Sequence, residues 1–152
     1  MIRPAQQRDR GAVEAIVRAA YSVYVERVGK RPGPMLDDYA KLIADGAVSV
    51  LEAPDGAIAA LIVLLAKPGH LLLDNIAVRP DRQGQGLGRG LVSFAESEAR
   101  RLGYAELRLY THEMMTENIA VYTRLGFRET GRGREAGYDR VFMTKAIAAV
   151  FP

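Results

Sequence analysis

Residues 78–88 read VRPDRQGQGLG and join an apolar run, residues 71–78, to an amphipathic pattern that ends near Gly103. Glycines leave the backbone N–H groups of such a turn uncovered, and the N-terminus of a following helix adds the positive end of its dipole. The turn therefore predicts a cradle for a phosphate group or, without a ligand, a tight strand-to-helix turn. Three arginines lie beside the turn in the sequence: Arg79, Arg82 and Arg89. They would either bind a small anionic ligand or be exposed to solvent.

Two common nucleotide motifs do not fit this turn. A P-loop ends in Gly-Lys-Ser/Thr, and the turn contains no lysine. A dinucleotide-binding turn needs Gly-x-Gly-x-x-Gly, but the third glycine would fall on Arg89 when counted from Gly84, and on Leu91 when counted from Gly86. A phosphate compound bound here therefore belongs to another class.

The composition is that of one globular domain over residues 1–152. Hydrophobic residues make up 49% of the chain and charged residues 26%, which is ordinary for a soluble protein. The chain has no cysteine, which excludes disulfides, cysteine-ligated metals and a cysteine nucleophile. Because only two histidines are present, His70 and His112, we expect no metal site.

Charge and hydropathy argue against two classes of partner. The net charge is +3, which is too small to indicate nucleic-acid binding. The longest strongly apolar run, residues 57–66, is only half as long as the roughly 20 residues that a membrane helix needs. The first residues, MIRP, contain no apolar signal region. We expect a cytoplasmic protein with no nucleic-acid and no membrane partner.

The spacing of apolar residues predicts an α+β fold. Helical spacing marks four stretches: residues 9–28, 35–44, 87–102 and 116–125. Apolar runs between turn signals mark strands: residues 1–4, 47–52, 57–66, 71–78, 105–111, 127–131 and 139–145, the last two joined by a loop. The order β-α-α-β-β-β-α-β-α-β-β predicts a mixed, mostly antiparallel central sheet with about four flanking helices.

Two motifs together resemble the GNAT superfamily of acyl-CoA-dependent N-acetyltransferases. Gln83-x-x-Gly86-x-Gly88 is similar to that family's Gln/Arg-x-x-Gly-x-Gly/Ala motif, and residues 73–78, LDNIAV, resemble its fourth strand. Residues 118–127, NIAVYTRLGF, resemble its second signature, which ends Tyr-x-x-x-Gly-Phe. The resemblance covers nearly the whole chain and has the motifs in the family's order.

The resemblance implies acetyl-CoA as cosubstrate and no metal. Members of the family bind CoA where the fourth and fifth strands splay apart. The pyrophosphate would lie on backbone N–H groups of residues 84–89, and the pantetheine against the backbone of residues 76–78. The cofactor residues carried over are Ile76, Ala77, Val78, Gln83, Gly84, Gln85, Gly86, Leu87, Gly88, Arg89, Asn118 and Tyr122.

The resemblance also implies direct transfer of the acetyl group to an amine. Tyr122 would protonate the departing thiolate, a role that suits a group with a reference pKa of about 10; alternatively it is a packed core aromatic. Asp74 interrupts an apolar strand, alternating with residues 72 and 76 on one face, and would take the proton of the acceptor ammonium or else bond local backbone. His112 and Glu113 are second choices for that base.

In this fold the first two helices and the last hairpin wall the acceptor pocket. The substrate-binding residues expected there are Tyr24, Met35 and Asp74. Tyr21 and Tyr24 both lie on the apolar face of their helix, which favours the core over the pocket for each of them. The acceptor is a primary amine of a small molecule or peptide, and homodimers are common in the family. The alternatives are a catalytically silent CoA-binding sensor or partner-binding module, and a toxin that acetylates aminoacyl-tRNA, which a net +3 supports poorly.

Overall fold

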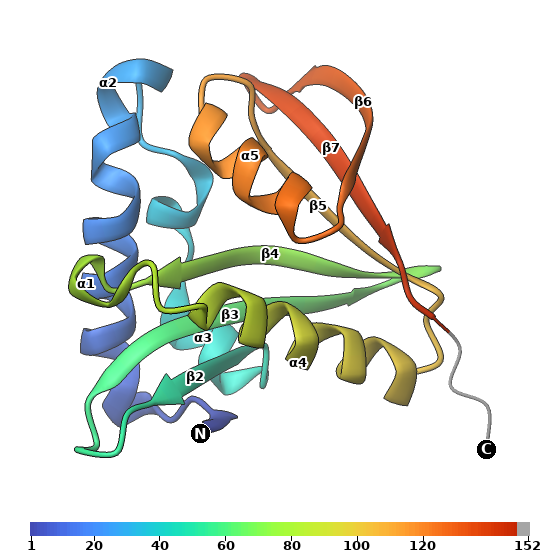
Figure 1. Cartoon of the computed structure of the whole chain (residues 1–152). Helices are drawn as coiled ribbons and strands as arrows, with labels where there is room; N and C mark the ends of the chain where they lie inside the picture. Colours follow the sequence, from blue (N-terminus) through green and yellow to red (C-terminus); the bar gives the residue numbers. More distant parts are fainter. Residues whose placement is uncertain (149–152) are drawn as a thin grey trace.

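The computed structural model describes residues 1–148, so the last four residues of the domain expected over 1–152 lie outside the described part. One seven-stranded sheet with the order β1-β2-β3-β4-β5-β7-β6 runs through the molecule (Figure 1). Its strands are β1 (Ile2–Pro4), β2 (Val48–Glu52), β3 (Ile58–Lys67), β4 (His70–Val78), β5 (Glu106–His112), β6 (Arg128–Glu135) and β7 (Tyr138–Ala146). Every neighbouring pair is antiparallel except β4 and β5, which are parallel.

Helices cover both faces of the sheet and enclose two cores. They are α1 (Arg10–Tyr21), α2 (Val25–Val28), α3 (Tyr39–Ala44), α4 (Leu87–Arg101) and α5 (Thr116–Arg124). The first core joins α1 and α3 to β2–β4 through fully buried residues such as Val13 and Val63. The second joins α4 and α5 to the opposite face through Leu91, Leu107 and Tyr122. The α+β class and the mostly antiparallel sheet are as predicted.

Two predicted helices are each divided in the structure. The helix expected over residues 9–28 divides into α1, a 3-10 turn and α2. The helix expected over residues 35–44 is a 3-10 turn over Gly33–Leu36 and then α3, because Asp38 restarts the helix by accepting a hydrogen bond from the Lys41 N–H at 3.1 Å. Between this 3-10 turn and α3, Asp37 has an extended backbone.

The loop expected between the last two strands is mostly strand. β6 continues to Glu135 and turns back through Ala136 and Gly137, both at positive φ. β6 is an edge strand whose residues are nearly all exposed, so it carries no apolar alternation from which its length can be inferred.

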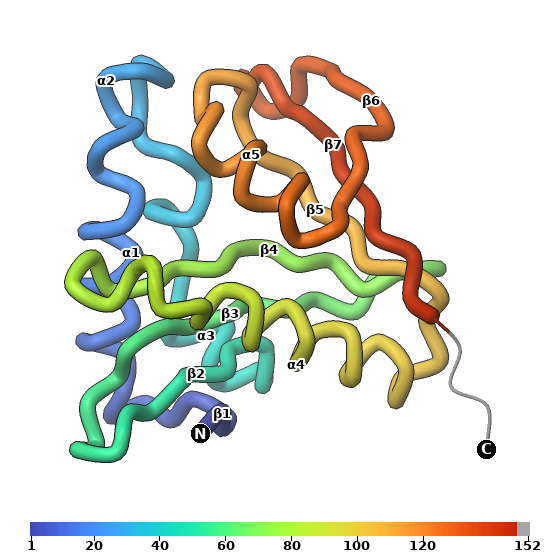
Figure 2. Tube along the Cα trace, viewed as in Figure 1, coloured from blue at the N-terminus to red at the C-terminus, as the bar shows by residue number. Residues whose placement is uncertain are grey.

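Two irregularities of β4 open the middle of the sheet. β4 and β5 pair only at Leu71–Leu107 and Leu72–Arg108, and beyond those pairs the two strands diverge (Figure 2). Against β3 the register shifts so that Val63 faces Asn75 and Leu64 faces Leu73. Asp74 is therefore the extra residue of a β-bulge, a device that redirects side chains beside functional sites.

Candidate active site

The glycine-rich turn presents bare backbone at the start of α4. Gly84 and Gly86 have φ of +81° and +77°, conformations that residues with a Cβ rarely adopt. Gly86 is the N-cap of the 15-residue helix α4, and no side chain caps its first N–H groups. Open space surrounds the position that a Cβ would take at Gly88. Unsatisfied N–H groups and the positive helix end together favour an anion here.

A cavity of about 380 Å³, which we call the turn cavity, lies between this turn, β4 and α5. It includes most of the residues predicted to bind a cofactor: Ile76, Ala77, Val78, Gln83, Gly84, Gly86, Leu87, Gly88, Asn118 and Tyr122. The other two predicted residues, Gln85 and Arg89, are exposed and lie outside this lining. The Gln83 amide donates to the Val78 carbonyl at 3.4 Å, which ties the turn to the end of β4.

Two of the arginines near the turn, Arg79 and Arg82, have different environments. Arg79 is engaged by Asp81 through hydrogen bonds of 2.6 and 3.0 Å. Arg82 lines the turn cavity, and its Nε is buried with no hydrogen-bond partner among the described residues. Because an unpaired buried N–H is costly, Arg82 is the arginine that an anionic ligand would stabilise.

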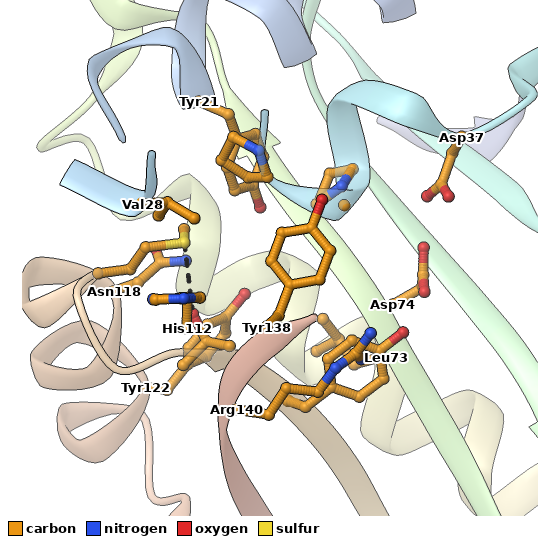
Figure 3. Close-up of a pocket in the computed structure, with 16 residues that line it drawn as sticks. Tyr21, Val28, Asp37, Leu73, Asp74, His112, Asn118, Tyr122, Tyr138 and Arg140 are labelled. Carbon is orange, nitrogen blue, oxygen red and sulfur yellow. Dashed lines mark hydrogen bonds between the residues drawn. The ribbon is translucent and has the colours of Figure 1, made fainter. Parts of the chain in front are cut away.

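A second cavity of about 190 Å³, which we call the aromatic cavity, lies beyond the point where β4 and β5 separate (Figure 3). Its lining includes four tyrosines, one histidine, one arginine and two aspartates: Tyr21, Tyr110, Tyr122, Tyr138, His112, Arg140, Asp37 and Asp74. Tyr21, Asn118 and Tyr122 line both cavities. Molecules entering from the two sides would therefore meet at these three side chains.

Tyr122 is held rigidly at this junction. It is 6% exposed, and its ring packs edge-on against Phe127 with the ring centres 5.6 Å apart. Burial and the negative charge of Asp74 raise the pKa of Tyr122 well above its ordinary value, although a hydrogen bond with the backbone of Ile76 partly opposes the shift. The hydroxyl therefore keeps its proton at neutral pH.

Tyr21, placed in the core as predicted, also lines both cavities and donates to the Ile76 carbonyl at 3.0 Å.

Two carboxyl groups approach each other on one wall of the aromatic cavity. Asp74 was predicted to act here, but Asp37 was not, because it fell inside a predicted helix. Burial raises the pKa of Asp37 to about 7, and the hydrogen bond and negative charge of Asp74 add to the shift. A sequence signal for Asp37 exists in the Asp37-Asp38 pair, because aspartate is a preferred N-cap and would start the helix after residue 38.

The remaining predicted residues lie at different distances from this wall. His112 lines the aromatic cavity, and its Nδ1 accepts a hydrogen bond from the Met114 N–H at 3.1 Å. Glu113 is exposed and lies 3.9 Å from Arg132. Tyr24 lines the turn cavity rather than the aromatic cavity, and Met35 packs against the first core.

The last hairpin was expected to wall the acceptor pocket, and two residues of its strand β7, which were not singled out from the sequence, do line the aromatic cavity. Tyr138 and Arg140 line the aromatic cavity, and the Arg140 guanidinium lies 3.9 Å from the centre of the Tyr110 ring.

Among residues 1–148, no three His, Cys, Asp or Glu side chains cluster as a metal site requires. Within the same range, no helix has the length and apolar character needed to cross a bilayer.

Comparison with known proteins supports the similarity seen in the motifs. Residues 11–127 match the model of the acetyltransferase (GNAT) family. The chain belongs to the GNAT family. Over 75 residues it is 39% identical to the [ribosomal protein bS18]-alanine N-acetyltransferase of Escherichia coli K12, a match that spans about half of each chain (49% of this one and 51% of the relative). A mycothiol acetyltransferase of Geodermatophilus obscurus is 40% identical over 52 residues, which is 34% of this chain and 17% of that protein.

Solved structures of GNAT proteins share the whole fold. The crystal structure of the Escherichia coli ribosomal-protein-S18-alanine N-acetyltransferase superposes with a TM-score of 0.70 and 25% identity, over 99% of this chain and 96% of that one. The PaiA N-acetyltransferase of Thermoplasma acidophilum, solved in complex with coenzyme A, gives a TM-score of 0.77 at 18% identity, over 96% and 98% of the two chains. At that identity the second likeness is evidence for the fold alone.

Proposed function

We propose that this GNAT protein is an acetyl-CoA-dependent N-acetyltransferase that acetylates a primary amine of a small molecule or peptide by direct attack. The observation that carries the proposal is the junction of two cavities at Tyr21, Asn118 and Tyr122. One cavity has the backbone and arginine that suit a phosphorylated donor, and the other has the carboxyl groups that suit an ammonium.

The turn cavity fits CoA on two independent grounds. The glycine turn, the N-terminus of α4 and the unpartnered Nε of Arg82 would hold the phosphates. The edge of β4 beyond Leu72, which β5 does not pair, leaves the backbone of residues 76–78 available to the amide-bearing arm. Bound there, acetyl-CoA would supply the thioester that is the acetyl donor.

Each chemical role falls to a residue that lines one or both of the two cavities. Asp74 accepts a proton from the acceptor ammonium, whose reference pKa of about 10.4 would otherwise keep it unreactive. A backbone N–H near Ala77 stabilises the negative charge that develops on the carbonyl oxygen. Tyr122 donates its proton to the departing sulfur, and the second proton of the nitrogen restores the hydroxyl. No acyl-enzyme on cysteine can form, since the chain has no cysteine.

The acceptor is a cation before it reacts, and the acidic wall of the aromatic cavity favours its approach. The relative from Escherichia coli is named for an alanine of a ribosomal protein. That name supports including short peptides with a free N-terminus among the acceptors to be tested, beside amino acids, polyamines and aminoglycosides.

The decisive experiment mixes the purified protein with acetyl-CoA and each acceptor class and follows the release of free CoA thiol. Because the chain has no cysteine, a thiol reagent detects only the product. Release with one class of amine is the expected result. Binding of acetyl-CoA without release for any amine would favour a silent CoA-binding module instead, and failure to bind acetyl-CoA would contradict the proposed site.

A further inference from the structure

The Asp37–Asp74 pair brings together two segments that are remote in the sequence. Asp37 lies on the extended link between the Gly33–Leu36 turn and α3, and Asp74 is the bulged residue of β4. Figure 3 shows their carboxyl groups facing each other across one wall of the aromatic cavity. Two carboxyl groups that face each other repel when both are ionised, so the pair favours a state in which one of them carries a proton.

A chain of hydrogen bonds fixes the relative position of the two segments. The Tyr39 hydroxyl donates to the Pro34 carbonyl at 2.6 Å and accepts from the Asn75 Nδ2 at 3.1 Å. Pro34 and Tyr39 bracket Asp37, and Asn75 is the neighbour of Asp74. The segments that carry the two carboxyl groups are therefore joined by one buried and one partly buried hydrogen bond of the Tyr39 hydroxyl.

No cation of the described chain neutralises the pair. Among residues 1–148, neither Asp37 nor Asp74 forms an ion pair, whereas Asp9, Asp45 and Asp81 each do. Arg140 lines the same cavity, but its guanidinium lies over the Tyr110 ring and 3.7 Å from a Glu135 oxygen. The other titratable groups around the pair are Tyr21, Tyr39, Tyr110, Tyr122, Tyr138 and His112.

We propose that Asp37 and Asp74 act as a single general base that removes the proton of the acceptor ammonium. The inference rests on the proposed function and adds Asp37 to the residues that perform it. The doubly ionised pair accepts one proton as an N–H bond of the ammonium breaks and an O–H bond forms. The two carboxyl groups then share that proton and release it to solvent after the amide has formed.

Pairing makes the carboxyl groups a better base than either would be alone. An isolated aspartate has a reference pKa of about 3.9 and an alkylammonium about 10.4, a gap of roughly 6.5 units. Two acids in contact resist ionising together, which raises one of the two pKa values. With the pKa of Asp37 raised to about 7, the gap narrows to roughly 3.4 units. Proton transfer is more efficient when the base approaches the acid in strength.

The test compares Asp37→Asn with Asp38→Asn, the same chemical change at the adjacent residue. Asp38 is exposed, and asparagine is as good an N-cap as aspartate, so its variant keeps α3. The wild type and Asp38→Asn should lose activity below about pH 7. In Asp37→Asn the acidic limb of kcat/KM should move down by about three pH units, toward the reference pKa of aspartate, and turnover at pH 7 should fall at least about tenfold.

A second measurement does not depend on activity. In protein carrying ¹³C at the aspartate carboxyls, NMR titration should show one group titrating near pH 7 in the wild type and in Asp38→Asn, and none in Asp37→Asn. If the wild type has no aspartate that titrates between pH 6 and 8, the pair is refuted. If the wild type is active and the acidic limb of its kcat/KM profile lies at the same pH as that of Asp37→Asn, the base role of the pair is refuted. The proposed transferase activity would still stand. Absence of CoA release with every amine would refute both.

Discussion

Replacing Tyr122 with phenylalanine removes one oxygen from the junction of the two cavities and leaves the packing in place. The ring retains its edge-on contact with Phe127, whose centre lies 5.6 Å away, because the contact involves no hydroxyl. The oxygen that is lost lies beside the backbone of Ile76, so the change removes at most one hydrogen bond. A hydrogen bond of this kind contributes about 0.5–1.5 kcal/mol, so the melting temperature should fall by only a few degrees in a chain of this length.

The effect on catalysis should be far larger than the effect on stability. A positioned general acid contributes about 10²–10⁴-fold to a rate, and the buried Tyr122 hydroxyl keeps its proton for donation because its pKa is raised. We therefore expect kcat to fall by about 10²-fold or more, with the affinity for acetyl-CoA changed little. The assay is steady-state CoA release with the accepted amine, beside calorimetric titration of acetyl-CoA.

Tyr21→Phe is the matched control for this prediction. It removes a hydroxyl that is also buried beside Ile76 and that donates to the Ile76 carbonyl at 3.0 Å. If that hydroxyl only supports the backbone, its loss costs at most about tenfold in any rate. Turnover by Tyr122→Phe within a few-fold of the wild type would refute the role of Tyr122 as the acid, as would equal losses in the two variants.

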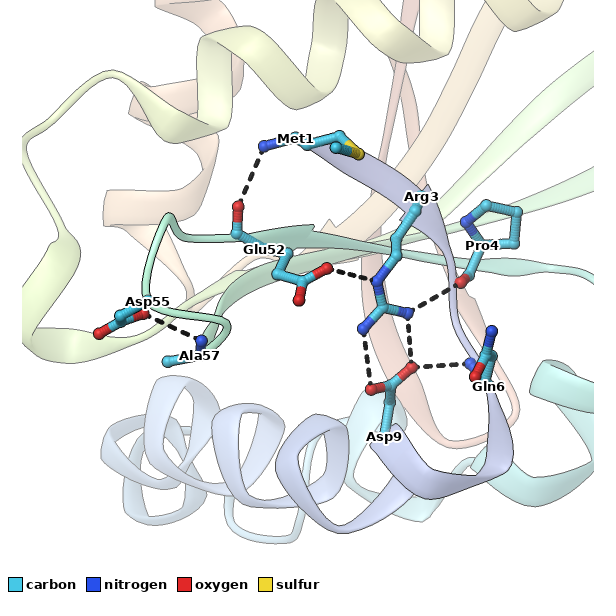
Figure 4. A network of polar contacts seen from close by, with 8 residues as sticks. All are labelled: Met1, Arg3, Pro4, Gln6, Asp9, Glu52, Asp55 and Ala57. Carbon is cyan, nitrogen blue, oxygen red and sulfur yellow. Dashed lines mark hydrogen bonds and ion pairs between the residues drawn. The ribbon is translucent and has the colours of Figure 1, made fainter.

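Three further changes test the turn and the N-terminal ion pairs. Gly86→Ala places a Cβ at φ +77°, which costs about 1–2 kcal/mol of stability and should also weaken the binding of CoA, as measured by denaturant unfolding and titration. Arg82→Ala removes an unpartnered N–H from the turn cavity, and the affinity for CoA should fall about tenfold or more, since a hydrogen bond to a charged group contributes about 1.5–3 kcal/mol. Asp9→Asn weakens the bonds that Asp9 accepts from Arg3 at 2.8 and 3.1 Å (Figure 4), and should cost about 1.5–3 kcal/mol of stability at pH 7. Because the guanidinium lowers the pKa of Asp9 below its usual value of 3.8, this stabilisation is present above about pH 4 and is lost as Asp9 protonates below it, so the difference between variant and wild type should shrink in acid.

Each of these changes has a control or a contradicting result. Gly88→Ala lies within α4 at a negative φ with open space around it, so it should not destabilise the fold. Arg89→Ala alters an exposed side chain outside the lining of the turn cavity and should weaken CoA binding less than Arg82→Ala. Equal losses in the two arginine variants would contradict the assignment of Arg82. A stability deficit in Asp9→Asn that persists unchanged at pH 3 would contradict the ion-pair argument.

The glycine turn and the second signature could be identified from the sequence because what they need is local. Gly84 and Gly86 each adopt a positive φ, a property of single residues that glycine permits. Helix α4 starts directly after Gly86. Residues 118 and 122 share a helix face through spacing alone. The sequence was less informative where the chain lacks periodicity. β6 is exposed along almost its whole length, so nothing in it distinguishes strand from loop.

The sequence by itself determined the family, the order of the main elements, and a glycine-rich turn followed by a tyrosine-bearing helix. Only the tertiary structure decided which side chains line the two cavities. The separation of β4 from β5 after two residue pairs opens the junction at Tyr122. The bulge at Asp74 and the break before α3 bring a second carboxyl, Asp37, beside the first. Those contacts join residues that are far apart in the sequence. They depend on strand register and on packing, which are properties of the whole sheet and cannot be inferred from a local pattern.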